Sequence, residues 1–337
     1  ERLGELKFLP RDEDDCRYVT SYHVDDKEGI LGFFEEYGVV VIRNVITEEA
    51  SQRTQQEMID ILESNSEFRM SDDTTWDCWP KSGMSRYGQL QRTPIFTCQV
   101  LENRQNESVL SSFAALLDVL PEELIVSHDR ACIYRPTMNM SGVHNGRVTK
   151  TNYHLDLSPW KYYGDYDVVA NRFHGLTYGS DVRHFISENN QVHSRHINLQ
   201  GGLNLRDNQE EDGGFVCVPG FHKLLEQWAR DNVDSRFNEH SVEQDSVSFS
   251  VKGGYPLDGF VQRVPCRANS LIIWDQRLPH GSFPNRSSNF RFAQFMKCFP
   301  RTRMGEKQRE HRRLTVRDHL AKCDFFPSSL GKCVFDQ

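Results

Sequence analysis

The sequence predicts a mainly β protein with flanking helices, in which short strands form a barrel or jelly roll. The first observation is a change near residue 125, after which short β-rich runs alternate with turn signals. The second is that Gly-Gly, Pro-Gly and Pro-Asn pairs separate these runs, and such pairs favour turns. Many short strands joined by such turns are typical of barrels and jelly rolls. We predict strands over 130–135, 150–156, 198–205, 214–218, 246–251, 259–264, 269–274 and 290–298.

The region before this core, residues 1–124, is predicted to be a helical flank. Residues 38–45 form a β-branched apolar run, which indicates a short buried strand. Thr47 is predicted to cap a helix over 47–63, because two glutamates follow it in the first turn and apolar residues recur later. The flank therefore begins with a strand followed by a helix.

A second helix is predicted over 109–120, where apolar residues recur at helical spacing. Pro121 is expected to end it, since proline cannot continue a helix. Residues 64–107 show no clear period and are expected to wrap the core as irregular structure.

Three further segments are distinct from the strands. A polar insertion occupies 157–197, a short helix is expected over 223–229, and a charged helix is expected over 305–322. We expect one domain over residues 1–337, made of a helical flank (1–124), a β core with the insertion (125–300), and a C-terminal helix and tail (301–337).

The composition excludes some classes of function. The net charge of −8 disfavours general binding to nucleic acid or to an anionic membrane, because phosphates require a basic face. The sequence has no apolar run near the roughly 18 residues that span a bilayer. Nine dispersed cysteines indicate free thiols in a reducing compartment, so we expect an intracellular, cytoplasmic protein. Because the chain begins with glutamate, an organelle signal upstream stays open.

A histidine and a carboxylate share the predicted strand 150–156. Alternation along a strand places His154 and Asp156 on one face. His280 follows the strand 269–274, and we expect it at that strand's end or in the turn beyond. Two histidines and one carboxylate are the ligand set of non-haem Fe(II) oxygenases. Taken singly, each histidine is also compatible with a hydrogen-bonded core residue, and other histidines compete: His174, His184, His193, His196 and His222.

Arg291 lies in an alternating strand, on the face that carries Ala293 and Phe295. An arginine on such a face is expected to be buried, and a buried guanidinium requires a partner such as a bidentate carboxylate. The partner is either a dicarboxylate cosubstrate or a carboxylate of the protein itself.

These residues resemble the phytanoyl-CoA dioxygenase (PhyH-like) family of Fe(II)/2-oxoglutarate oxygenases. The resemblance rests on His154-x-Asp156, on the Gly-Gly-Phe-Val-Cys-Val-Pro-Gly-Phe-His segment over 213–222, and on His-Gly-Ser-Phe-Pro-Asn-Arg-Ser from His280, followed by Arg291. The strand and helix of the flank are also similar, and the resemblance spans roughly residues 25–300. The family often has Pro-Gly-Ser-His where this chain has Pro-Gly-Phe-His, and the 157–197 insertion is longer than usual.

The resemblance implies a double-stranded β-helix core of the jelly-roll or cupin-like kind. It implies iron on His154, Asp156 and His280, with Arg291 binding the distal carboxylate of 2-oxoglutarate with help from Ser282. Fe(II), 2-oxoglutarate and O2 would be used, with ascorbate as a reductant, and succinate and CO2 released. Related halogenases have a small residue in place of the carboxylate, so Asp156 favours hydroxylation. The resemblance implies no catalytic side chain beyond the metal ligands.

The substrate is expected to be a small organic molecule of a kind that the sequence does not specify. Arg135, Trp160 and Lys161 flank the metal motif and are candidates for the pocket mouth, although fold support and surface exposure account for them equally. Three alternatives remain open: a non-catalytic or regulatory binding protein with the same fold, a cupin-like enzyme without 2-oxoglutarate, and an oxygenase acting on a macromolecule. The oligomeric state is not specified either.

Overall fold

The larger of two main sheets spans the molecule. The computed structural model describes residues 6–80, 85–91, 93–139, 142–156, 159, 199–232, 247–248, 257–303 and 306–337. The larger sheet has the strand order β1-β2-β12-β8-β14-β3, and β4 also pairs with β14. Its strands are β1 (Ser21–Tyr22), β2 (Val39–Ile42), β3 (Leu124–Val126), β4 (Ala131–Tyr134), β8 (Leu199–Asn204), β12 (Ser270–Asp275) and β14 (Arg291–Pro300).

The smaller sheet has the order β10-β7-β13-β9-β11. Its strands are β7 (Asn152–Leu155), β9 (Gly214–Cys217), β10 (Val247–Ser248), β11 (Gln262–Arg263) and β13 (His280–Phe283), and a separate pair joins β5 (Met138–Asn139) to β6 (Gly142–Val143). The two main sheets meet through their side chains. The rings of Trp274 on β12 and Phe215 on β9 have centroids 4.4 Å apart. The space between the sheets is therefore the interior into which a site can open.

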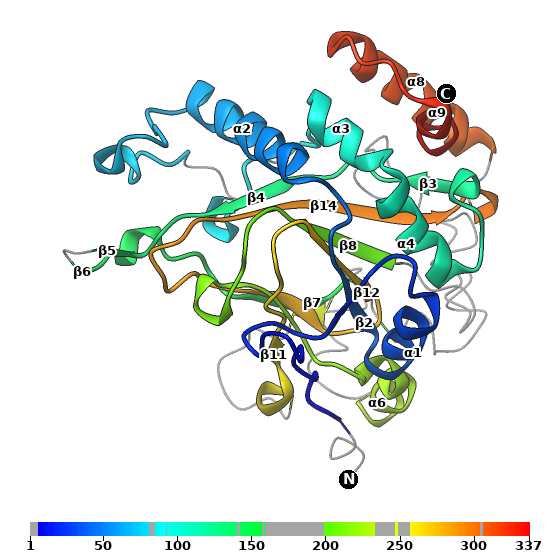
Figure 1. The fold of residues 1–337 in the computed structure, drawn as a ribbon, viewed down its shortest axis with the longest axis horizontal. Coiled ribbons are helices and arrows are strands. Elements are labelled where there is room, and N and C mark those ends of the chain that lie inside the picture. The colour runs from blue at the N-terminus through cyan, green and yellow to red at the C-terminus, as the bar shows by residue number, and fades with distance from the viewer. Residues whose placement is uncertain are drawn as a thin grey trace.

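Helices cover the outer face of the larger sheet. Figure 1 shows α2, α3 and α4 lying along that face, with β7 and β11 of the smaller sheet on the opposite side. One close contact accounts for a glycine, because a Cβ atom at Gly201 of β8 would lie 2.6 Å from the ring of Phe113 on α4. The helices are α1 (Lys27–Tyr37), α2 (Glu48–Ser64), α3 (Cys98–Arg104), α4 (Glu107–Leu117), α6 (Leu225–Asp231), α8 (Glu306–Lys322) and α9 (Ser329–Phe335).

The N-terminal flank joins the core directly. Strand β2 pairs antiparallel with β12, and Val39 lies opposite Trp274. All four residues of β2 are buried, as expected for an apolar, β-branched run covered on both faces. At the other end of the chain, Arg312 of α8 donates a hydrogen bond to the carbonyl of Val126 on β3 (2.8 Å). Figure 1 shows α8 and α9 together at that end of the molecule.

The mainly β architecture with flanking helices agrees with the sequence prediction. The predicted cap is also confirmed, since the Thr47 side chain accepts a hydrogen bond from the amide of Ala50 (3.2 Å). The helix predicted over 109–120 ends earlier, at Leu117, because Asp118 adopts a left-handed conformation with φ of 52°. Pro121 instead begins a short 3-10 turn.

Other predictions need correction. The stretch 64–107 contains α3, whose seven residues are too few to show a helical period. Helices α1 and α9 and strand β3 were also missed. His280 neither ends the preceding strand nor lies in the turn, because it begins a strand of its own, β13. Of the predicted strand 246–251 the structure describes only β10, and the insertion 157–197 lies outside the described residues apart from residue 159.

Two bulk expectations can be compared with the structure. All nine cysteines are free thiols. Among the described residues, no helix has both the length and the apolar character needed to cross a bilayer.

Candidate metal centre

Strand pairing brings the two predicted histidine ligands together. Strands β7 and β13 run antiparallel, and His280 lies directly opposite His154. Their ring centroids are 4.7 Å apart. Asp156 follows β7 by one residue, and one ligand atom from each of the three side chains lies within 4.8 Å of the others. The two histidines and the carboxylate therefore form a cluster of a size that one metal ion can bind.

The surroundings of His280 favour the protonation state that binds a metal. Its Nδ1 lies 2.9 Å from the carbonyl oxygen of Leu278. Because a carbonyl only accepts, Nδ1 carries the proton and Nε2 keeps a free lone pair. Burial, followed by the proximity of His154, lowers the pKa of His280 to about 4. The ring is therefore neutral at physiological pH.

Asp156 is held by donors on several sides. Its Oδ1 lies 3.0 Å from His154 Nε2, and its Oδ2 accepts a 2.6 Å hydrogen bond from Gln200 Nε2. The Nζ of Lys297 lies 3.8 Å from Oδ2. Burial alone would raise the pKa of the Asp156 carboxyl, but His154 and Lys297 hold that pKa well below its usual range. The group is therefore an anion, as a metal ligand must be.

Arg291 forms a second feature between the sheets. It lies opposite Tyr134 on β4, and its guanidinium carbon is 4.9 Å from the centre of that ring. Nη1 donates to the thiol of Cys132 at 3.3 Å. Nε is buried and has no hydrogen-bond partner among the described residues. No carboxylate oxygen of the described residues lies within 4.0 Å of this guanidinium, so an internal salt bridge, one of the two predicted partners, is not found there.

A glycine is required beside this arginine. Gly214 has φ of 109°, a conformation that L residues rarely adopt. A Cβ atom at Gly214 would collide with the Arg291 guanidinium. Ser282 of β13 lies near the Tyr134 side chain, whose ring lies under the arginine. Gly214 therefore lets the guanidinium, whose Nε lacks a described partner, pack directly against the backbone of β9.

Aromatic rings form one wall of the metal cluster. The centroid of Trp274 lies 5.4 Å from that of His280, and the centroid of Phe215 lies 6.2 Å from it. Both aromatic side chains are buried. This wall limits the access of water to His280.

The remaining predicted site residues lie elsewhere. Arg135 donates to the carbonyl of Trp76 (2.6 Å) and stacks over Trp79, with 4.8 Å between its guanidinium carbon and the ring centre. These contacts support the fold, and a role of Arg135 in substrate binding stays a prediction. Trp160 and Lys161 lie outside the described residues. Of the competing histidines, His222 is outside the cluster, and the others, His174, His184, His193 and His196, are not described.

Sequence reasoning missed two residues next to Asp156. Lys297 had a detectable signal, because it continues the alternation of Arg291, Ala293 and Phe295 toward the interior. Gln200 had a weaker one, as a polar residue in a predicted buried strand. Gln200 contacts Asp156, which follows a strand of the other sheet, and the sequence does not reveal contacts between sheets.

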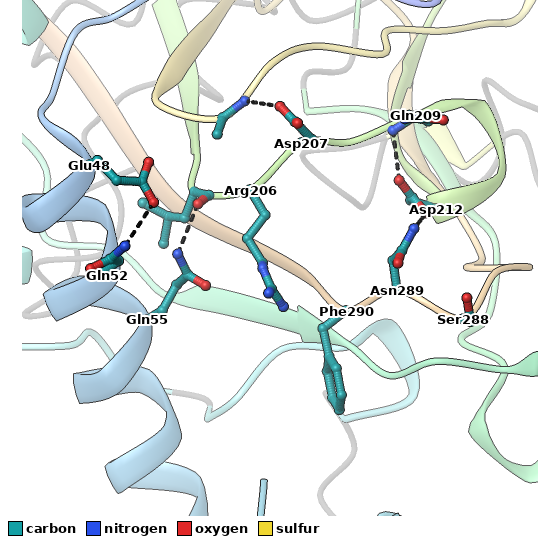
Figure 2. A pocket seen from close by; sticks show the side chains of 12 residues that line it. Glu48, Gln52, Gln55, Arg206, Asp207, Gln209, Asp212, Ser288, Asn289 and Phe290 are labelled. Atoms are coloured by element: carbon teal, nitrogen blue, oxygen red, sulfur yellow. Dashed lines mark hydrogen bonds between the residues drawn. The ribbon is translucent and has the colours of Figure 1, made fainter. Parts of the chain in front are cut away.

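A separate cavity lies beside α2 and the loops next to the ends of β8, β12 and β14. It encloses about 710 Å³ between α2 and the loops around β8 and β14 (Figure 2). Its polar side chains are largely paired with one another, as in the hydrogen bonds from Gln52 to Glu48 (3.0 Å) and from Asn289 to Asp212 (3.0 Å). It contains none of the three clustered ligands. This cavity is not part of the metal centre.

The donor set fits iron. Two imidazoles and one carboxylate suit a divalent transition metal and leave coordination positions for other ligands. The buried Arg291, with its Nε unpaired among the described residues, fits an organic carboxylate. The fold and the site together define a metal-dependent oxygenase of the two-histidine, one-carboxylate class.

The chain belongs to the phytanoyl-CoA dioxygenase (PhyH) family, whose family model matches residues 34–293. A Dictyostelium discoideum protein named for phytanoyl-CoA dioxygenase is 37% identical over 297 residues, which cover 87% of this chain and 81% of that protein. Ava biosynthesis cluster protein O of Aspergillus versicolor is 21% identical over 297 residues, 85% of this chain and 82% of that protein.

Among solved structures, the product of GlcNAc Inducible Gene 2 of Candida albicans aligns with a TM-score of 0.60. The alignment covers 90% of this chain and 71% of that chain at 14% identity, which is a likeness of fold alone. Family membership and the clustered ligands make the chain an Fe(II)/2-oxoglutarate-dependent oxygenase, as predicted from the sequence.

Proposed function

We propose that the chain hydroxylates a small organic molecule, with His154, Asp156 and His280 holding Fe(II) and Arg291 binding 2-oxoglutarate. The observation that carries the proposal is the pairing of two features in one interior. One is the compact ligand cluster, and the other is a buried arginine without a carboxylate partner among the described residues. Either feature alone would also fit a purely structural role, whereas their combination fits a metal and a dicarboxylate bound together.

The strand connections support a double-stranded β-helix core. Along the chain, β4, β8, β12 and β14 belong to the larger sheet, whereas β7, β9, β11 and β13 belong to the smaller one. The chain crosses between the sheets at almost every step, as two interleaved strand layers require. We also propose that residues 1–337 form one domain, since β2 of the flank pairs with the core strand β12.

Arg291 is proposed to pair with the distal carboxylate of 2-oxoglutarate. A guanidinium offers a planar fork of donors that matches a carboxylate, and a buried pair of this kind is strong. Its Nε is an unused donor within the described part of the chain. Ser282 and Tyr134 add hydroxyl groups beside this position. Burial excludes competing water, which strengthens the pair.

The protein's own groups would bind, orient and shield the reactants. The iron and 2-oxoglutarate, when bound, would supply the oxidising chemistry: O2 is reduced, 2-oxoglutarate becomes succinate and CO2, and a substrate C–H becomes C–OH. His280 offers Nε2 because Leu278 fixes its tautomer. Asp156 fills the position that halogenases leave for chloride, so hydroxylation is the expected outcome. Trp274 and Phe215 limit water around His280.

The substrate is proposed to be small. The acidic net charge of −8 disfavours nucleic acid. Arg135, Trp160 and Lys161 remain candidates for contacts with it. Lys297 joins them as a cation beside the metal cluster, with its side chain 19% exposed. Succinate release measured across a panel of small molecules, with ascorbate as the reductant, would identify the substrate.

The first test is anaerobic titration of the protein with Fe(II) and 2-oxoglutarate. A weak visible charge-transfer band is expected, and His154→Ala should abolish it. His222→Ala is the matched control, because His222 lies outside the ligand cluster, so the band should persist. Absence of the band in the wild-type protein, or its persistence in His154→Ala, would contradict the proposal.

A further inference from the structure

Three side chains form a row across the larger sheet beside the metal cluster. Trp274 on β12 lies directly opposite Gln200 on β8, and Gln200 lies directly opposite Lys297 on β14. Directly opposite residues of antiparallel strands project from the same face. Gly201, the next residue of β8, faces Phe113 on the helix side. Because neighbouring residues alternate, Gln200 faces the interior, and so does the whole row.

Trp274 fixes which way the Gln200 amide points. The indole nitrogen of Trp274 lies 2.8 Å from Gln200 Oε1. An indole N–H can only donate, so the atom facing it must be the amide oxygen. The amide nitrogen is thereby turned the other way, toward Asp156. The Asp156 carboxylate can only accept, so both contacts favour the same orientation of the amide.

Gln200 in turn fixes the Asp156 carboxylate. Its Nε2 donates to Oδ2 at 2.6 Å, and Lys297 adds a positive charge 3.8 Å from the same oxygen. The main chain is held as well, because Gln276 donates to the Asp156 carbonyl (2.9 Å). The carboxylate therefore presents a fixed edge to both histidines, with Oδ1 3.0 Å from His154 Nε2 and Oδ2 3.8 Å from His280 Nε2.

We propose that Gln200 is a positioning residue for the metal-binding carboxylate, and that Trp274 sets its orientation. Groups that orient a metal ligand commonly change metal affinity tenfold or more when they are removed. Trp274 also packs against the His280 ring, with 5.4 Å between centroids, so it connects two of the three ligands. This inference rests on the proposed function, since it assumes that Asp156 binds the metal.

The test is metal affinity, measured by calorimetric titration of the metal-free protein with Mn(II) and without 2-oxoglutarate. Gln200→Leu keeps the size of the side chain and removes the donor, so Mn(II) should bind about 10- to 100-fold more weakly. Trp274→Phe keeps a ring against His280, although a smaller one, and removes the N–H donor. It should weaken Mn(II) binding about fivefold, the effect of one neutral hydrogen bond.

The matched control is Gln294→Leu. Gln294 is a buried glutamine on β14 that is hydrogen-bonded to Asn103 and to the Val100 carbonyl, on the helix side of the same sheet. This variant should lose thermal stability but keep the wild-type Mn(II) affinity. A loss of affinity in Gln294→Leu equal to that in Gln200→Leu would overturn the proposal, because it would indicate a general effect of disturbing the sheet.

Two further outcomes are decisive. If folded Gln200→Leu binds Mn(II) like the wild type, the inference is wrong while the proposed function stands. If Gln200→Leu does not fold, Trp274→Phe decides in the same way, and wild-type affinity there overturns the inference. Failure of the proposed function would give a different result. The wild-type protein would then either bind no Mn(II) or bind it with an affinity that His154→Ala leaves unchanged.

Discussion

Replacing Arg291 by methionine should separate the binding of 2-oxoglutarate from the stability of the fold. Methionine is unbranched like the stem of arginine, reaches about as far as Nε and has no charge. Arg291 is 5% exposed, and no carboxylate of the described residues lies within 4.0 Å of its guanidinium. Replacing a buried charge by an apolar residue is often neutral or stabilising. The unliganded variant should therefore melt at or above the wild-type temperature.

The affinity for 2-oxoglutarate should decrease in Arg291→Met, even though the stability of the unliganded protein does not. Removing one partner of a buried ion pair costs about 3–5 kcal/mol, because the other charge stays buried without compensation. At about 1.4 kcal/mol for each factor of ten, 2-oxoglutarate should bind roughly 100- to 4000-fold more weakly.

Thermal melting of the Mn(II)-loaded protein, with and without 2-oxoglutarate, measures both effects. A ligand at 100 times its Kd stabilises by about 2.7 kcal/mol. At roughly 2 °C per kcal/mol for a chain of this size, the wild type should gain about 5 °C. Arg291→Met should gain less than about 1 °C at the same concentration. Arg291→Lys, which keeps the charge but loses the fork, should gain an intermediate amount.

Two results would refute this reasoning. A large loss of stability in the unliganded Arg291→Met variant would mean that Arg291 pairs with a carboxylate of the chain. A 2-oxoglutarate response equal to that of the wild type would mean that the cosubstrate binds elsewhere or is not used.

Three other predictions concern the fold around the site. His128 is buried and neutral, because burial, and to a lesser extent the nearby Arg104, lower its pKa well below 6.5. Below pH 6.5 the unfolded chain therefore binds one more proton at this residue than the folded chain does. The free energy of unfolding should therefore fall as the pH decreases below about 6.5, and this group contributes up to about 1.4 kcal/mol per pH unit. Urea titrations at two pH values should show that the free energy of unfolding depends less on pH in His128→Leu than in the wild type. Gly214→Ala should destabilise the protein by more than about 1 kcal/mol and weaken 2-oxoglutarate binding, because φ at this residue is positive and the new methyl group would collide with Arg291. The control Gly146→Ala should do neither, because the space around Gly146 is open. Treatment with EDTA should lower the melting temperature and abolish succinate release, and Fe(II) should restore both; unchanged melting would mean that the fold binds no metal.

The clustering of His154, Asp156 and His280 could be predicted because it follows local rules. Alternation along a strand paired His154 with Asp156, and the same rule predicted that Arg291 faces inward. His280 was expected at the end of the strand 269–274 or in the turn beyond, and β13 was not predicted, because its four residues include a glycine and a serine and show no apolar alternation. The contact between Gln200 and Asp156 was not predictable at all. It joins residues of two sheets, and its geometry depends on the register of β8 against β12.

The pairing of β2 with β12 determines how short a functional chain can be. Strand β2 covers the edge of the strand that carries Trp274, and Val39 lies opposite that tryptophan. A truncated chain starting at the predicted core boundary near residue 125 would leave the backbone of β12 unpaired beside the metal cluster, and such an edge invites aggregation. We therefore expect that the smallest unit that folds begins before Val39, and the family match begins at residue 34. We expect the flank to be needed for a stable core, because it supplies the strand that pairs with β12.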